Sequence, residues 1–256
     1  MKVVIIGGTG LIGKQVGALL RQGGHEVTAA APSTGVNTLT GEGLAQALQG
    51  AQVVVDVSNS PSFEPAAVMD FFQTSTRNVL GAAQAAGVRH LVALSVVGTD
   101  RLPQSGYFLA KLAQEQLIRA SALPHTIVRA TQFHEFLGAI ADAATREGRV
   151  HAPSAGIQPI ASADVALGVA RAATAEPVNG LTEIAGPVAF RMDELLRGWL
   201  QQRSDAREVV TDESAGYFGA PLKADSLLPG AGAWLAPTTL QAWSAAQAAS
   251  STAATA

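Results

Sequence analysis

The chain contains no cysteine among its 256 residues. This absence excludes a disulfide framework, a thiolate metal site and a cysteine nucleophile, and it fits a reducing compartment. Charged residues make up 14% of the chain and aromatic residues 5%, so the core must consist mainly of Ala, Val, Leu and Ile. The formal charge of −3, without a run of Lys or Arg, argues against a nucleic-acid surface and favours a small-molecule ligand.

Long apolar runs are also missing. None approaches the roughly 18 residues that a membrane-spanning helix needs, and Lys2 leads directly into an apolar segment, which leaves no room for a signal peptide. We therefore expect a cytoplasmic protein without membrane contact. The length suits one α/β domain with a substrate-binding appendage, or two small domains, and the sequence leaves a homo-oligomer open.

The stretch from Lys2 to Leu20 organises the rest of the chain. A buried strand, Val3 to Ile6, runs into GGTGLIG and then into a helix with apolar residues at helical spacing. Glycines permit a tight turn and close approach to a pyrophosphate, and the free N–H groups at the helix start face the anion. An ordinary glycine-rich turn is the alternative. The cofactor-binding residues expected here are Gly7, Thr9, Gly10, Leu11, Ile12 and Gly13.

Strands and helices are expected to alternate after this unit. The pattern β-α-β-α-β predicts a doubly wound parallel sheet, the Rossmann fold. We expect an NAD(P)-binding domain over residues 1–150, a smaller substrate-binding lobe over 151–249 interleaved with the sheet, and a frayed tail at 250–256. Predicted strands cover 3–6, 26–31, 51–57, 90–96, 125–129 and 181–185, and the pattern loosens over a turn at 152–156 and the segment 157–161. Predicted helices cover 43–49, 65–86, 109–121, 133–147, 163–174 (capped by Ser162), 192–202 and 238–248.

Ligands of such a sheet bind beyond the carboxyl ends of its strands. The second strand ends in three alanines without an acidic residue, so a 2′-phosphate would not be repelled there, and Ser33 and Thr34 could donate to it. This favours NADP over NAD, although the loop carries no Arg. Ser58 and Asn59 follow the third main strand and are assigned to the cofactor; Asn59 serves equally well as a turn residue.

A second motif lies beyond the strand at 90–96. Tyr107 and Lys111 are four residues apart at a helix start and share one face, while Ser95 ends the preceding strand. Carbonyl reduction uses a phenol as proton donor, a Lys to lower the phenol's pKa, and a hydroxyl to orient the substrate oxygen. We therefore predict Ser95, Tyr107 and Lys111 as catalytic residues, with Lys111 also holding the nicotinamide ribose. A surface pair is the plainer alternative for the Tyr and Lys.

The residues after the strand at 125–129 are assigned to the nicotinamide and substrate side. Thr131 and Gln132 could bond the carboxamide, with Thr131 taken as a cofactor residue and Gln132 as substrate-side. Phe133, His134 and Phe136 are expected to face the substrate, although Phe at helical spacing is often plain core. The five histidines are scattered, and His134 has no partner at metal-ligand spacing, so we predict no metal.

These motifs resemble a known superfamily. GGTGLIG at 7–13, SVVG at 95–98 and YFLAK at 107–111 are similar to the short-chain dehydrogenase/reductases, and HTIVRATQFHEF at 125–136 resembles their atypical, NmrA-like NAD(P)-binding branch. The resemblance implies a Rossmann domain with a smaller carboxyl-terminal lobe, NADPH preference, and reduction of a carbonyl, quinone or imine. Two departures stand out: the superfamily's catalytic Asn would fall near Phe72, and Pro32 stands where basic residues often read the phosphate.

Three functions compete on this basis. The fingerprint and the trio favour an NAD(P)H-dependent reductase with a small-molecule substrate. A non-catalytic NAD(P)-binding redox sensor of the NmrA-like type is the alternative, and the missing Asn counts for it. A sugar-nucleotide epimerase is disfavoured, because the short carboxyl-terminal lobe lacks an obvious basic pair for a second diphosphate.

Overall fold

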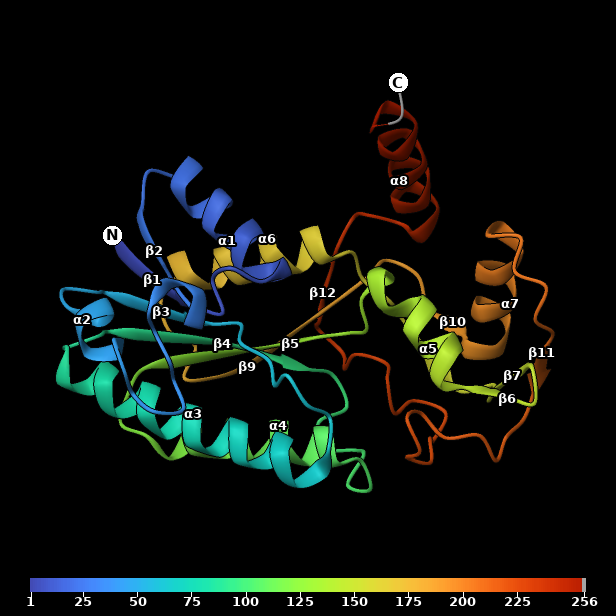
Figure 1. Cartoon of the computed structure of the whole chain (residues 1–256), viewed down its shortest axis with the longest axis horizontal. Coiled ribbons are helices and arrows are strands. Elements are labelled where there is room, and N and C mark those ends of the chain that lie inside the picture. Colours follow the sequence, from blue (N-terminus) through green and yellow to red (C-terminus); the bar gives the residue numbers. More distant parts are fainter. Residues whose placement is uncertain (255–256) are drawn as a thin grey trace.

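The computed structural model describes the backbone of residues 1–254 and the side chains of residues 1–249 (Figure 1). Over this part of the chain, the centre is a seven-stranded sheet in the order β12-β9-β5-β4-β3-β1-β2, with every pairing parallel. The predicted doubly wound parallel sheet is confirmed. Its strands are β1 (Lys2–Ile6), β2 (Glu26–Ala30), β3 (Val53–Asp56), β4 (His90–Val96), β5 (His125–Ala130), β9 (Gly180–Ala185) and β12 (Trp234–Leu235).

Helices cover both faces of the sheet, as Figure 1 shows. The helices α1 (Leu11–Gln22) and α6 (Ser162–Thr174) pack on one face, where Val16 and Val165 belong to the same core as Val3 and Val92. On the other face, α2 (Leu44–Leu48), α3 (Pro65–Ala85) and α4 (Gly106–Ala120) enclose a second core. Central strands buried from both sides explain the continuous apolar runs in the sequence.

The order of the strands fixes where a ligand would bind. The chain runs outward from β1 to β2 on one side and continues through β3 on the other, so the sheet changes winding direction at β1 and β3. A crevice forms at such a switch point, outside the carboxyl ends of the strands. The glycine turn after β1 and the exit loop of β3 meet there: a Cβ added at Gly7 would lie 2.9 Å from Ser58 Cα.

A smaller lobe follows β5, drawn from yellow-green to orange in Figure 1. Its core holds Leu137, Ile140, Leu196 and Trp199, and it meets α4 through Phe108. Because β9, β12 and α6 return to the main sheet, the lobe is interleaved with it, whereas the boundary at residue 150 stays a prediction. Its elements are a 3₁₀ turn (His134–Phe136), α5 (Leu137–Ala143), β6 (Thr145–Arg146), β7 (Arg149–Ala152), β8 (Gly156–Ile157), β10 (Phe190–Arg191), α7 (Met192–Gln202) and β11 (Val209–Thr211).

Several predicted elements need correction. The single helix expected over 133–147 is a 3₁₀ turn followed by α5, and the chain then reverses into the hairpin β6–β7 through Glu147 and Gly148, which both have positive φ. In the segment 157–161, where the sequence pattern loosens, the structure has the end of β8 and an isolated bridge at Ile160. The final helix, α8 (Leu240–Ala254), extends beyond 248, while the side chains of the predicted tail 250–256 lie outside the described residues.

Membrane-spanning helices and metal-binding clusters are both absent from the described residues. No helix among them has both the length and the apolar character to cross a membrane. They also contain no group of three or more His, Asp or Glu side chains arranged to hold a metal ion.

Candidate functional site

The glycine turn after β1 is held by close backbone packing. Gly7 has a φ of +77°, and its N–H donates to Ala30 O over 2.9 Å. A Cβ at Gly8 would lie 2.7 Å from Ala29 Cα, and one at Gly13 would overlap the carbonyl of Gly7. Only glycine therefore fits at positions 7, 8 and 13 without movement of the backbone.

The helix that follows leaves its first N–H groups free for an anion. The residue Gly10 precedes α1, and no side chain caps the helix. The amides of Leu11, Ile12 and Gly13 have no intrahelical acceptor, as at any helix start. Thr9 and Leu11 are exposed beside them. These amides fit a pyrophosphate, because the helix dipole favours negative charge at the same place.

The loop after β2 contains the residues assigned to a 2′-phosphate. Thr34 lies in the 3₁₀ turn Pro32–Thr34, and its hydroxyl lies 3.0 Å from both Ala29 O and Ala31 O and accepts from Ala31 N–H over 2.9 Å. It therefore closes the loop and has no spare proton for a phosphate. The Ser33 side chain is exposed and can still donate to an incoming group.

The exit loop of β3 is built around the buried Asp56. Its Oδ1 accepts from Ser58 N–H over 3.0 Å and from Ser58 Oγ over 2.6 Å. The exposed Asn59 uses Oδ1 to accept from Ser60 N–H over 3.0 Å, which is the turn role. The Asn59 amide nitrogen is left for a ligand.

Thr131 and Gln132 supply unpaired polar atoms at the carboxyl end of β5. Both residues are buried, and within the described chain Thr131 Oγ1 and both polar side-chain atoms of Gln132 have no hydrogen-bond partner. Buried groups left unpaired cost free energy, so such a cluster calls for a bound partner. A carboxamide, which has both a donor and an acceptor, matches these atoms.

Lys111 is fully engaged with the protein. It is 3% exposed, and its Nζ donates to Leu94 O over 2.8 Å and to Gln114 Oε1. The ring of Phe72 lies 4.4 Å from Nζ, in the position where the resemblance would have a catalytic Asn. Burial lowers the pKa of Lys111 to about 8, against the opposing effect of the Asp56 and Glu115 carboxylates.

Tyr107 lies among aromatic rings, with ring centroids 5.8 Å from Phe63, 6.1 Å from Phe72 and 6.1 Å from Phe108. Burial raises the pKa of its phenol to about 12. The expected lowering of this pKa by Lys111 is not seen, because the lysine points to Leu94 and Gln114 instead. At neutral pH Tyr107 is therefore a protonated phenol.

Ser95 faces a buried ion pair rather than Tyr107. Its hydroxyl donates to Glu115 Oε1 over 2.7 Å, and Glu115 in turn binds Arg129, with Nε–Oε1 at 2.8 Å and Nη2–Oε2 at 2.7 Å. Thr99 Oγ1 lies 3.4 Å from Ser95 Oγ. The three residues predicted as catalytic thus share the region between β4 and α4, without a hydrogen bond between any two of their side chains among the contacts of the described chain.

The residues after Gln132 divide into two groups. Phe133 stacks on Phe136 with centroids 5.4 Å apart, and Phe136 is 50% exposed, so this pair can meet a substrate. His134 is buried, with Nε2 3.0 Å from Pro159 O and its ring against Trp243, while its Nδ1 has no hydrogen-bond partner within the described residues.

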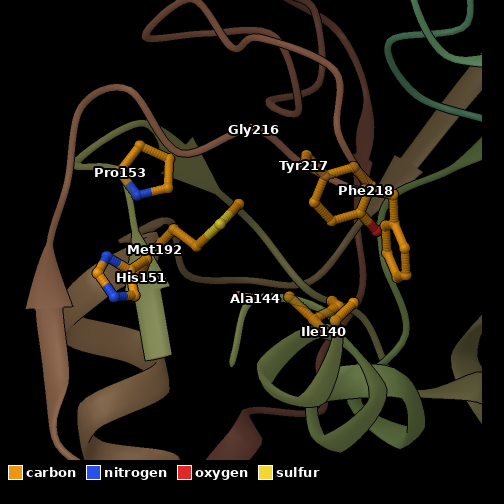
Figure 2. Close-up of a pocket in the computed structure, with 9 residues that line it drawn as sticks. Ile140, Ala144, His151, Pro153, Met192, Gly216, Tyr217 and Phe218 are labelled. Carbon is orange, nitrogen blue, oxygen red and sulfur yellow. The ribbon is translucent and has the colours of Figure 1, made fainter. Parts of the chain in front are cut away.

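Sequence reasoning did not find several residues around this region. Glu135, and not Ser162, satisfies the start of α6, since its carboxylate accepts from Ser162 N–H over 3.2 Å and from Ser162 Oγ over 2.6 Å. His151 and Tyr217 line a pocket in the smaller lobe, shown in Figure 2. Neither residue lies in a recognisable sequence motif. The one feature that could have pointed to this pocket is the aromatic pair Tyr217 and Phe218 among glycines and prolines.

A switch-point glycine turn, a free helix start and unpaired polar side-chain atoms just after β5 are together typical of a dinucleotide-binding protein. The family model described as NAD(P)H-binding matches residues 7–176, and the chain belongs to this family. The NAD(P)-binding family expected from the resemblance is confirmed by this match.

Relatives and solved structures agree with this assignment. The chain is 33% identical over 145 residues to a (4-alkanoyl-5-oxo-2,5-dihydrofuran-3-yl)methyl phosphate reductase of Streptomyces griseus, covering 51% of this chain and 48% of that protein. It is 25% identical over 151 residues to the photosystem II assembly factor Ycf39 of Cyanophora paradoxa, covering 54% and 47%. The chain thus spans about half the length of these curated relatives.

One similar solved structure is a short-chain dehydrogenase/reductase superfamily protein from Agrobacterium tumefaciens with bound NAD. It shares 18% identity at a TM-score of 0.73, over 100% of this chain and 99% of the other. At this identity the likeness concerns the fold alone.

Proposed function

We propose that the protein is an NAD(P)H-dependent reductase of a small carbonyl, quinone or imine-type substrate. The observation that carries the proposal is the unpaired Thr131 and Gln132 side chains just after β5. Arg129 of this strand binds Glu115 of α4, the helix that bears Tyr107 and Lys111. The unpaired atoms fit a nicotinamide carboxamide, and the reactive ring of the cofactor would then lie next to a phenol. The named reductase among the relatives supports this assignment.

The chain's residues would hold the cofactor along the carboxyl edge of the sheet. The amides after Gly10 would bind the pyrophosphate, Asn59 a ribose, and Thr131 with Gln132 the carboxamide. Ser33 would bond a 2′-phosphate, and the absence of an acidic residue after β2 favours NADP over NAD. When bound, the reduced nicotinamide supplies the hydride that the substrate carbon receives.

Tyr107 would donate its phenolic proton to the substrate oxygen as the hydride arrives, so that a carbonyl becomes an alcohol. A phenol with a pKa of about 12 carries its proton at neutral pH, although a proton donor works best with a pKa nearer the operating pH. Lys111 would contact the nicotinamide ribose if the dinucleotide replaced Leu94 O or Gln114 Oε1 as its acceptor. Ser95 would orient the substrate oxygen only after its hydroxyl left Glu115.

The test compares the wild type with Tyr107→Phe. NADPH and NADH are first titrated by calorimetry, and we expect tighter binding of NADPH. NADPH oxidation is then followed with a panel of carbonyls, quinones and imines. Tyr107→Phe should reduce turnover at least 100-fold while the dinucleotide affinity changes less than threefold. Unchanged turnover would contradict the role of the phenol.

A redox sensor is the second candidate. The ring of Phe72 lies next to Lys111 and Tyr107, in the position where the resemblance would have a catalytic Asn. Because an aromatic ring cannot relay a proton, this contact favours the sensor. The sensor predicts dinucleotide binding, no oxidation of NADPH with any member of the panel, and no effect of Tyr107→Phe on binding.

A further inference from the structure

The segment Tyr217–Ala220 folds into an unusual turn over the smaller lobe. Tyr217 N–H donates to Ala220 O over 2.7 Å, and Ala220 N–H donates to Tyr217 O over 3.1 Å. Phe218 and Gly219 between them have φ of +48° and +83°, the pattern of a type I′ turn. Asn, Asp or Gly normally takes the first of these positions, so a phenylalanine there is strained. Backbone strain of this kind concentrates at ligand-binding sites.

The turn is linked to the candidate site through aromatic contacts. The Tyr217 ring lies 6.3 Å from Phe108, whose ring lies 6.1 Å from Tyr107. Phe218 packs edge-on against Tyr217 at 4.8 Å and is 57% exposed. The turn is therefore separated from the proposed proton donor by one aromatic ring, that of Phe108. No hydrogen bond of the Tyr217 hydroxyl is found within the described residues.

A second polar group lies across the pocket from this turn. Figure 2 shows Tyr217 and Phe218 on one side and His151 with Pro153 on the other, and Met192 and Ile140 also contribute to the lining. His151 Nδ1 lies 3.2 Å from Asp212 Oδ2. Because a carboxylate only accepts, the proton is on Nδ1, which leaves Nε2 for another partner.

The pocket is only partly enclosed and has a cavity of about 10 Å³. That volume holds about one water, so a larger molecule fits only if side chains of the lining move. The lining has the chemistry of a small-molecule site, apolar with two polar groups at opposite sides, although such sites usually have volumes of roughly 300–1,000 Å³.

We propose that Tyr217 and Phe218 form the substrate-side wall of the site, and that His151, oriented by Asp212, binds a polar substituent remote from the reacting carbonyl. The substrate is then a compact, mainly apolar ketone with a hydroxyl or similar group on its far side. This inference rests on the proposed reductase function.

The test uses two probes of equal size, 4-hydroxycyclohexanone and 4-methylcyclohexanone. The wild type should show at least a tenfold higher kcat/KM with the hydroxy ketone, and His151→Leu should reduce this ratio to below threefold. Asp212→Asn should reduce the ratio in the same direction while retaining the imidazole. A preference that both variants leave unchanged would overturn the role of His151.

Phe218→Asn tests the wall. Asn tolerates positive φ, so the turn should persist and the melting temperature should stay equal or rise. We expect KM for both ketones to rise at least fivefold with the KM for NADPH unchanged. Two variants are the matched controls. Val178→Asn replaces an exposed apolar residue just before β9, and His25→Ala replaces the residue just before β2. Neither control should change the KM for either ketone or the KM for NADPH. Unaltered KM values in Phe218→Asn would contradict the wall.

Direct binding separates this inference from the proposed function. Each ketone is titrated by calorimetry into the NADPH complexes of the wild type and of Phe218→Asn. Ketone binding that Phe218→Asn weakens, without any turnover by the wild type, supports the wall and contradicts the reductase. Turnover of other carbonyls without binding or reduction of either ketone overturns the inference and leaves the reductase standing.

Discussion

Arg129 and Glu115 form a buried, two-pronged ion pair between β5 and α4. Nε–Oε1 is 2.8 Å and Nη2–Oε2 is 2.7 Å, and the side chains are 4% and 1% exposed. Asp100 adds a third contact, with its Oδ1 3.1 Å from Arg129 Nη1. Ser95 donates to the same carboxylate, so the pair fixes the end of β4 relative to α4.

Breaking this pair should strongly destabilise the fold. Glu115→Gln removes the two-pronged partner of the buried Arg129 charge and leaves Asp100 and the more distant Glu183, at 4.0 Å, as counter-ions. Loss of one partner of a buried pair costs about 3–5 kcal/mol. Urea unfolding monitored by circular dichroism measures the free energy of unfolding. Glu208→Gln, in the exposed pair with Arg149, is the control and should cost less than about 1 kcal/mol. Equal effects in the two variants would contradict the structural role.

The glycine turn gives a second prediction. A Cβ at Gly13 would overlap the Gly7 carbonyl and lie 2.7 Å from Gly8 Cα, so Gly13→Ala must move the turn. We expect NADPH affinity to fall at least tenfold, measured by calorimetric titration. Gly81→Ala in α3 is the matched control, since a Cβ there meets nothing within 4 Å. Its unfolding free energy should rise by up to about 1 kcal/mol through helix propensity, with NADPH binding unchanged.

The parts of this fold that depend on local pattern could be predicted from the sequence. The strand His90–Val96 and the helix Met192–Gln202 begin and end where the apolar periodicity indicates. β12 could not be foreseen, because its two residues, Trp234 and Leu235, become a strand only by pairing with β9, about fifty residues earlier in the chain. Short edge pairing is a tertiary effect without a local signal.

The candidate site also has parts that could be predicted from the sequence and parts that could not. The positions of the glycine turn and of the polar residues after each strand could be predicted, because parallel strands end at one edge of the sheet. The side-chain partners do not: Ser95 pairs with Glu115, and Thr34 closes its own loop. One signal was available, since Arg129 inside an apolar strand requires a buried acid, and α4 carries Glu115 on its sheet-facing side.

Lys111 makes the stability of the protein depend on pH. Burial lowers its pKa from 10.5 to about 8. Between these values the unfolded chain holds a proton that the folded chain has lost, so the free energy of unfolding rises with pH. Below pH 8 both states are protonated and the cost of the buried charge is constant. The total rise is on the order of 3 kcal/mol.

The comparison with Lys111→Met isolates this contribution. Urea unfolding of both proteins is measured from pH 7 to 10.5. The free energy of unfolding of the wild type, minus that of the variant, should rise by about 3 kcal/mol over this range, mostly between pH 8 and 10.5. All other titrating groups are common to the two proteins, so their contributions cancel in this difference. A difference independent of pH would show that the lysine pKa is not lowered.

The unpaired atoms of Gln132 give the sharpest test of the cofactor site. Gln132→Leu removes two buried polar atoms that have no partner in the described chain, so the free energy of unfolding of the apoprotein should rise by about 1–2 kcal/mol. The same change removes the groups assigned to the carboxamide, and NADPH affinity should fall at least tenfold in calorimetric titration. Ser75→Ala is the matched control, because Ser75 Oγ is also buried and unpaired but lies in the middle of α3. Ser75→Ala should leave NADPH affinity unchanged, and a Gln132→Leu variant that behaved in the same way would remove Gln132 from the site.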